Sequence, residues 1–207
     1  MSKILILDNY DSFTYNLVQY IEELAGEKVT VMRNDKITVA EVDAYDTIIL
    51  SPGPGLPVDA GIMPELIKVY QFSKRILGVC LGHQAIIESF GGTIRNLSRV
   101  YHGVATNINQ TENKSVLFKD ISKTYTAGRY HSWSSVKDDI PKELQITGVD
   151  DQGEIMAIQH VRLPIYGVQY HPESIMTAVG KKILANFLQL PYEISQKDYA
   201  LENATNR

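Results

Sequence analysis

Gly78-Val79-Cys80-Leu81-Gly82-His83-Gln84 lies between a short apolar run, Arg75-Ile76-Leu77, and a segment with helical spacing that ends at Gly91-Gly92. A cysteine flanked by glycines, where a strand turns sharply into a helix, follows the nucleophile-elbow pattern G-x-[S/C]-x-G. The flanking residues must be small because the chain folds back on itself around the nucleophile. The positive end of the helix dipole favours the thiolate form of the sulfur. The motif therefore predicts a strand, a tight turn and a helix, with Cys80 as a candidate catalytic nucleophile.

Cys80 is the only cysteine among the 207 residues, so no disulfide within the chain accounts for it. However, a free cysteine at the end of a core strand is often buried and inert, and short glycine-spaced motifs recur by chance. The motif alone supports a catalytic and a structural role about equally.

The size and composition of the chain indicate one globular domain, or one domain with a small appended subdomain. Hydrophobic residues make up 44% of the chain, which is enough for a substantial core. The net charge of −4 argues against a nucleic-acid or anionic-membrane partner, since either would require a basic patch. No apolar run approaches the ~20 residues that cross a bilayer, and the apolar start is interrupted too early for a signal peptide. Together with the single cysteine, these features predict a cytoplasmic protein.

The first half of the chain alternates between strand-like and helix-like segments. Strands are expected over 3–7, 28–32, 46–50 and 76–79, and helices over 13–24, 39–44 and 62–74. Asp11 or Ser12 is expected to cap the first helix, and Gly26 to end it. The segment Ser51–Pro57 contains two glycines and three prolines, which predict a rigid loop. The alternation predicts a largely parallel sheet with helices on both faces, in which this loop and Cys80 share the ligand-binding edge.

Short strand-like runs dominate the second half of the chain. They cover 93–95, 104–108, 115–118, 144–149, 154–160 and 165–170. Turn signals such as Asp150-Asp151-Gln152-Gly153 lie between them, so we expect antiparallel hairpins that extend the sheet and add a small side sheet. A last amphipathic helix is expected over 179–188. Residues 191–207 are polar and are expected to form a tail outside the domain of 1–190.

A cysteine nucleophile needs a histidine base, and the histidine needs an acceptor that orients it. His171 ends a strand-like run and lies two residues before Glu173, so in an extended segment both side chains project to the same side. Pro172 between them stiffens the pair. The other positions suit a base less well: a helix for His83, a turn for His102 and a strand for His160. A turn with a surface ion pair would have the same spacing as a catalytic pair, so both explanations stay open here.

Three motifs in this order resemble those of the class I (triad) glutamine amidotransferases: Ser51–Gly55, Gly78–Gln84 and His171–Ser174. The resemblance runs from Asp8–Asn16 to the last helix and leaves only the tail uncovered. It implies a three-layer α/β/α, flavodoxin-like fold with a mostly parallel central sheet. Within the family, Asp8–Asn16 and Gly128–Ser132 resemble the small subunit of anthranilate synthase. The small subunit of 4-amino-4-deoxychorismate synthase has nearly the same marks.

The resemblance implies that Cys80 attacks the side-chain carboxamide of L-glutamine, while His171, oriented by Glu173, protonates the departing ammonia and then activates water. It also implies that backbone N–H groups of Leu81 and of the loop Gly53-Pro54-Gly55 hold the oxyanion. Three more residues match family positions that hold the α-amino and α-carboxylate groups of glutamine: Gln84, Ser132 and Trp133. Each of these three also has a structural explanation, namely a helix surface, a turn, and a core or interface anchor.

The chain has no residues left over to bind chorismate or to aminate it. The resemblance therefore implies that ammonia passes to a larger chorismate-binding synthase subunit, in a heterodimer or heterotetramer, and that the isolated chain has low activity. We expect the docking surface near the active-site edge, including Asn9–Thr14 and the region around Tyr101-His102-Gly103. Helix capping is a simpler explanation for Asn9–Thr14. No cofactor or metal is expected in this chain, and magnesium is expected only on the partner.

Two other functions fit parts of the pattern. A stand-alone cysteine hydrolase, such as a γ-glutamyl hydrolase or an intracellular-peptidase-like protein, would share the sheet and the elbow. The loop Pro52–Gly55 together with His171-Pro172-Glu173 favours amidotransfer instead. A flavodoxin-like binding module with a structural Cys80 would not account for the three residue types of a triad. The sequence favours tryptophan biosynthesis as the pathway, with folate biosynthesis or service to both as the alternative.

Overall fold

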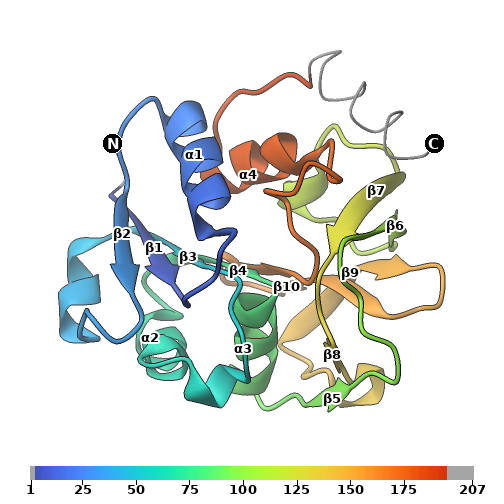
Figure 1. The fold of residues 1–207 in the computed structure, drawn as a ribbon, viewed down its shortest axis with the longest axis horizontal. Coiled ribbons are helices and arrows are strands. Elements are labelled where there is room, and N and C mark those ends of the chain that lie inside the picture. The colour runs from blue at the N-terminus through green and yellow to red at the C-terminus, as the bar shows by residue number, and fades with distance from the viewer. Residues whose placement is uncertain (1–2, 195–207) are drawn as a thin grey trace.

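The computed structural model describes residues 3–194, and its centre is a nine-stranded sheet of order β2-β1-β3-β4-β11-β10-β9-β6-β7 (Figure 1). Five neighbouring strands are parallel: β2 (Thr30–Arg33), β1 (Ile4–Asp8), β3 (Thr47–Leu50), β4 (Arg75–Val79) and β11 (Ile165–Val168). Four antiparallel strands extend them: β10 (Ile155–His160), β9 (Leu144–Asp150), β6 (Val104–Gln110) and β7 (Thr124–Arg129). A small second sheet pairs β5 (Ile94–Asn96) with β8 (Trp133–Ser135). The predicted sheet and its antiparallel additions are confirmed.

Within residues 3–194, four α-helices cover the two faces of the large sheet and give it three layers. They are α1 (Thr14–Ala25), α2 (Met63–Tyr70), α3 (Leu81–Ser89) and α4 (Gly180–Leu188). Successive residues of β1 face opposite sides: Ile6 packs in the core beneath α1 and α4, whereas Leu5 and Leu7 pack in the core beneath α2 and α3. Figure 1 shows these two pairs of helices on opposite sides of the sheet. Because β1 is buried on both faces, its sequence is continuously apolar rather than alternating.

One local expectation, the strand over 115–118, is wrong. The apolar run 115–118 is not a strand but a 3-10 turn, η3 (Val116–Phe118), and Asn186 of α4 donates hydrogen bonds to the backbone carbonyls of Leu117 and Lys119. Leu117 and Phe118 are apolar because they are buried, which a strand pattern does not distinguish. The short helix expected over 39–44 is confirmed, as a 3-10 helix, η1 (Ala40–Ala44).

The first turn of α1 also differs from the expectation. Phe13 holds the N-cap position without a side-chain hydrogen bond, so neither Asp11 nor Ser12 caps the helix. Asp11 accepts instead from the backbone N–H of Phe13 at 2.7 Å, and Asp8 accepts from the Thr14 hydroxyl at 2.9 Å. The predicted end of α1 is confirmed, since the residue after Ala25, a glycine, has φ 70°.

Most of the polar C-terminal tail expected over 191–207 lies outside the described residues, since the description ends at residue 194. Within residues 3–194, no helix has both the length and the apolar character needed to cross a membrane. At the carboxyl edge of the parallel strands, only Cys80 separates β4 from α3.

Candidate active site

Cys80 occupies the sharp turn between β4 and α3. Its backbone has φ 51° and ψ −98°, a conformation that a non-glycine residue rarely adopts. The flanking glycines are required by contact: a Cβ on Gly78 would lie 2.3 Å from the carbonyl oxygen of Gly82, and one on Gly82 would lie 2.6 Å from that of Leu50. The spacing of the elbow motif therefore reflects the close packing of α3 on β3 and β4.

The predicted substrate residues line one cavity of about 160 Å³ beside Cys80. Its walls include every predicted contact (Gly53, Pro54, Gly55, Leu81, Gln84, Ser132 and Trp133), together with Tyr130 and His131. Gly53 packs closely on the chain, because a Cβ there would lie 2.7 Å from the carbonyl oxygen of Asn9. Segments separated by up to 80 residues in the sequence thus meet at the thiol.

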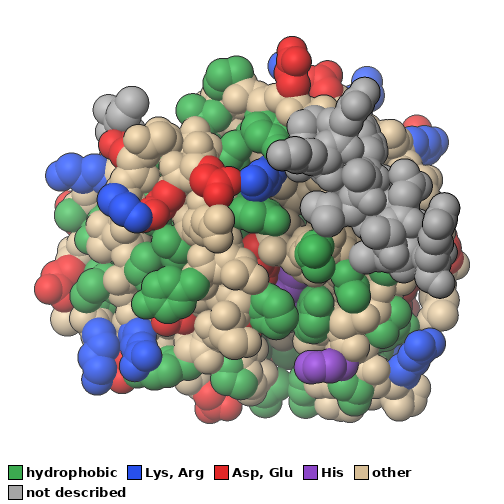
Figure 2. All heavy atoms as spheres, turned by 45° about the horizontal axis from the view of Figure 1, so that its top comes forward, with side chains coloured by type: hydrophobic (Ala, Val, Ile, Leu, Met, Phe, Trp, Pro, Cys, Tyr) green, Lys and Arg blue, Asp and Glu red, His purple; other side chains and the backbone are tan. Residues whose placement is uncertain are grey.

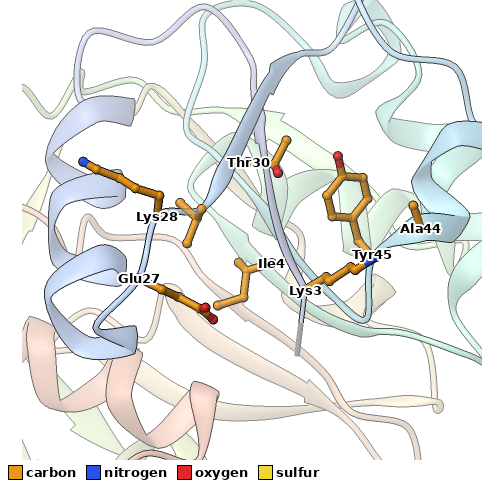
Figure 3. Close-up of a pocket in the computed structure, with 8 residues that line it drawn as sticks. Lys3, Ile4, Glu27, Lys28, Thr30, Ala44 and Tyr45 are labelled. Atoms are coloured by element: carbon orange, nitrogen blue, oxygen red, sulfur yellow. The ribbon is translucent and has the colours of Figure 1, made fainter. Parts of the chain in front are cut away.

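A larger cavity of about 390 Å³ lies at the opposite, amino-terminal end of β1 and β2 (Figure 3). It is lined by Lys3, Ile4, Glu27, Lys28, Val29, Thr30, Ala44 and Tyr45, none of which is a predicted site residue. We assign the site to the smaller cavity because it contains the strained cysteine.

His171 and Glu173 form a buried pair beyond the end of β11. Nδ1 of His171 lies 2.7 Å from Oε1 of Glu173, and each residue is 2% exposed. The backbone of His171 is fixed on both sides, since its N–H donates to the Gly128 carbonyl at 3.0 Å and its carbonyl accepts from the Thr177 hydroxyl at 2.7 Å. The burial excludes the surface ion pair that the sequence had left open.

Competing effects determine the charge of His171. Burial lowers the pKa of the ring, but hydrogen bonding with Cys80 and Glu173 and the charges of these two groups raise it more, so the pKa lies well above its ordinary value. The second ring nitrogen, Nε2, is buried and makes no hydrogen bond of good geometry. Cys80 and Glu173 therefore both favour the imidazolium form of His171.

Gln169 is a neighbour of the thiol that sequence reasoning missed. Its Nε2 lies 3.7 Å from the sulfur of Cys80, and its Oε1 accepts from Nε2 of Gln84 at 3.1 Å. The same Nε2 of Gln84 donates to the carbonyl of Trp133 at 3.1 Å. A signal was available, because Gln169 precedes His171 by two residues and so projects to the same side of an extended segment.

Three other histidines, His83, His160 and His102, lie in the kinds of structure that were expected for them. His83 is fully buried on α3 and lies 3.4 Å from the Ser135 hydroxyl, and burial lowers its pKa to about 4. His160 ends β10 and packs on Phe90 with ring centroids 5.2 Å apart. His102 is exposed beside Gly103, which has φ 66°. Within residues 3–194, no three His, Cys, Asp or Glu side chains gather to hold a metal ion.

Residues 5–190 match the model of the family described as glutamine amidotransferase class-I, and the chain belongs to that family. It is an enzyme of the glutamine amidotransferase class. More particularly, it is 47% identical over 188 residues to aminodeoxychorismate/anthranilate synthase component 2 of Bacillus subtilis, a match that covers 90% of this chain and 95% of that one.

Two further relatives carry one of these names each. Identity is 46% over 195 residues to anthranilate synthase component 2 of Saccharolobus solfataricus (91% and 98% covered). It is 44% over 187 residues to aminodeoxychorismate synthase component 2 of Escherichia coli (89% and 98% covered). The chain also matches the bifunctional protein TrpGD of Thermotoga maritima at 42% identity over 193 residues, spanning 32% of its length. The fold matches the solved structure of a glutamine amidotransferase from Thermotoga maritima, with a TM-score of 0.71, 12% identity and coverage of 99% and 94%.

Proposed function

We propose that this chain is the glutaminase subunit of anthranilate synthase, which hydrolyses L-glutamine with Cys80, His171 and Glu173 and delivers ammonia to a chorismate-binding synthase subunit. One observation carries the proposal: a buried histidine–carboxylate pair, 2.7 Å apart, faces a cysteine held in a strained turn at the end of a parallel strand. This combination provides a nucleophile, a base and an orienting group in one place.

In the proposed reaction, the Cys80 sulfur attacks the carboxamide carbon of glutamine, and a tetrahedral oxyanion forms. The N–H of Leu81, at the start of α3, and the backbone of Gly53–Gly55 stabilise that charge. His171 gives its proton to the leaving ammonia, and a γ-glutamyl thioester remains on the sulfur. His171 then takes a proton from water, which attacks the thioester and releases glutamate.

The proposed contacts to the α-amino and α-carboxylate groups come from Gln84, Ser132 and Trp133, which line the same cavity. The carbonyl of Ser132 accepts from the Leu97 N–H at 2.7 Å. In a planar trans peptide the C=O and the following N–H point in opposite directions, so the N–H of Trp133 points away from β5. This orientation supports a backbone contact between Trp133 and the substrate carboxylate.

The docking surface proposed for the synthase lies beside the catalytic pair. The ring of Phe13 lies 5.5 Å from that of His171, between centroids, so the segment Asn9–Thr14 reaches the base directly. Exposed hydrophobic side chains, Tyr15, Val100 and Ile175, immediately flank this segment, the Tyr101–Gly103 region and the motif of His171. Figure 2 shows a face of the molecule on which hydrophobic and histidine side chains occur together, with acidic and basic side chains interspersed.

The pathway is part of the proposal. Tryptophan biosynthesis is favoured by the sequence marks, and folate biosynthesis or service to both is the alternative, since the relatives carry either name or both. The assay is copurification with candidate synthase subunits, followed by identification of the aromatic amine made from glutamine and chorismate. No cofactor in this chain takes part, and magnesium is assigned to the synthase subunit.

The division of labour has a direct test. Cys80→Ser is expected to abolish amine synthesis from glutamine while leaving synthesis from added ammonium unchanged in the complex. His160→Gln, which changes a histidine at the far end of the sheet, is the matched control and should retain both activities. Loss of both activities in Cys80→Ser, with the complex still assembled, would contradict the proposal.

A further inference from the structure

A buried charge lies directly behind the substrate cavity without lining it. Arg129, at the end of β7, has no exposed surface, and its Nη1 donates to Oδ2 of Asp150 at 2.6 Å. Its guanidinium carbon lies 3.6 Å from the centroid of the Tyr101 ring. Removing two charges from water costs about as much as their attraction returns, so a buried ion pair is a poor source of stability. The ion pair is therefore better explained by what it positions than by the stability that it adds.

His131 connects this ion pair to the cavity wall. Nε of Arg129 donates to Nε2 of His131 at 3.0 Å, and Nδ1 of His131 lies 2.7 Å from the carbonyl oxygen of Trp133. Because arginine can only donate, Nε2 must be the unprotonated nitrogen and Nδ1–H must donate to Trp133. Burial and the charge of Arg129 lower the pKa of His131 to about 3, which keeps this neutral tautomer at physiological pH.

The carbonyl of Trp133 accepts two side-chain hydrogen bonds, one of them from α3. It accepts from Nδ1 of His131 at 2.7 Å and from Nε2 of Gln84, on α3, at 3.1 Å. The two preceding carbonyls, of His131 and Ser132, accept from backbone N–H groups at 3.0 and 2.7 Å. Three successive peptide planes are therefore fixed, and with them the directions of the N–H groups that face the other way.

We infer that Asp150, Arg129 and His131 are positioning residues that orient the Ser132–Trp133 backbone and the Gln84 amide, and so set the affinity for the α-amino and α-carboxylate groups of the substrate. The inference rests on the proposed function, in which this cavity holds glutamine. Among the hydrogen bonds of the described residues, none joins these three side chains to the sulfur of Cys80. They should affect the binding of the amino-acid end and leave the reactivity of the thiol unchanged.

Two variants of His131 separate its hydrogen bond with Arg129 from its hydrogen bond with the Trp133 carbonyl. Asn at this position can place an N–H where Nδ1–H was and keep the bond to Trp133, whereas Gln can accept from Arg129 and loses the bond to Trp133. The probes are 6-diazo-5-oxo-L-norleucine, which carries the amino-acid end, and iodoacetamide, which does not. Adducts on Cys80 of the full chain are followed by mass spectrometry.

We expect His131→Gln to raise the inhibition constant of the diazo-ketone about 10- to 100-fold, because the buried Trp133 carbonyl loses its main hydrogen-bond donor. His131→Asn is expected to stay within about fivefold of the unsubstituted chain. The rate of alkylation by iodoacetamide should stay within about twofold in both variants. His160→Gln is the matched control and should change neither the inhibition constant nor the rate of alkylation. In glutamine hydrolysis by the complex, His131→Gln should raise KM far more than it lowers kcat.

Equal diazo-ketone affinity in His131→Gln and His131→Asn would overturn the inference, as would a parallel loss of iodoacetamide reactivity, which indicates a general loss of structure. Failure of the proposed function has a different signature. In that case the unsubstituted chain would react with iodoacetamide at Cys80 but not with the diazo-ketone.

Discussion

Nδ1 of His171 lies 2.7 Å from Oε1 of Glu173, and neither side chain is more than 3% exposed. Little water reaches the pair, so the carboxylate is the main stabiliser of positive charge on that side of the ring. A buried, hydrogen-bonded carboxylate of this kind fixes both the tautomer and the orientation of an imidazole. The pair is therefore the part of the site whose electrostatics can be tested most directly.

Glu173→Gln is expected to lower the pKa of His171. The amide keeps the size of the side chain but removes the negative charge, which is one of the causes that raise the pKa of the ring. The measurement is an NMR titration of the His171 ring nitrogens. Glu143→Gln is the control, since this carboxylate acts on His160 and not on His171. An unchanged or higher pKa in Glu173→Gln would show that the carboxylate does not stabilise the imidazolium.

Gly82, two residues after the nucleophile, allows a second prediction. Gly82→Ala would place a Cβ 2.6 Å from the carbonyl oxygen of Leu50, which is backbone and cannot rotate away. Since α3 must shift to relieve this contact, we expect a loss of stability of about 1–3 kcal/mol and loss of glutamine hydrolysis. Glu88→Ala, at an exposed position of the same helix, should change neither. Full activity in Gly82→Ala would mean that the elbow tolerates a wider turn.

The motifs that were predictable from the sequence are those whose residues are close together in the chain, because short spacing fixes their relative positions. Gly78, Cys80 and Gly82 belong to one turn, and His171 and Glu173 belong to one extended segment, so spacing alone carries their geometry. The parallel half of the sheet was predictable for a similar reason, because strands and helices alternate regularly there.

The parts that could not be predicted depend on contacts between distant segments. Arg129 and Asp150 lie 21 residues apart, and nothing in either neighbourhood indicates that the two pair in the interior. The run Ser115–Phe118 was expected as a strand because apolar content was its only signal. In the structure, a 3-10 turn packed against α4 buries Leu117 and Phe118 and leaves Val116 exposed. Capping of α1 failed as a prediction because the helix begins at Thr14, with Phe13 at the N-cap position, and the Asp11 carboxylate accepts from the N–H of Phe13.

His83 makes the stability of the protein sensitive to acid. Its pKa falls from an ordinary 6.5 to about 4 in the folded state, so below pH 6.5 the unfolded state binds more protons and the free energy of unfolding decreases. Between pH 7 and pH 4 this single group should remove about 3 kcal/mol. Over this pH range, His83→Gln is expected to lose about 3 kcal/mol less stability than the unsubstituted chain. The measurement is urea unfolding at each pH.

The control for this measurement is His102→Gln, which changes an exposed histidine and should follow the pH dependence of the unsubstituted chain. His171 acts in the opposite direction. Its raised pKa contributes stability below pH 6.5 that is lost as the pH rises through the folded-state pKa. The difference between His83→Gln and the unsubstituted chain isolates one group from the others, and identical pH dependence in the two would contradict the assignment.

The hydroxyls of Tyr125 and Tyr170 lie 2.8 Å apart in the core between β7 and α4, and both side chains are buried. Burial raises the pKa of both phenols, so both stay neutral and one hydroxyl donates to the other. Tyr125→Phe would leave the Tyr170 hydroxyl without this partner, at a cost of about 1–3 kcal/mol. Replacing both by Phe removes both polar groups, so the double variant should be more stable than the sum of the single changes predicts. Urea unfolding of the four proteins gives the coupling free energy, and a value near zero would show that each hydroxyl has an alternative partner.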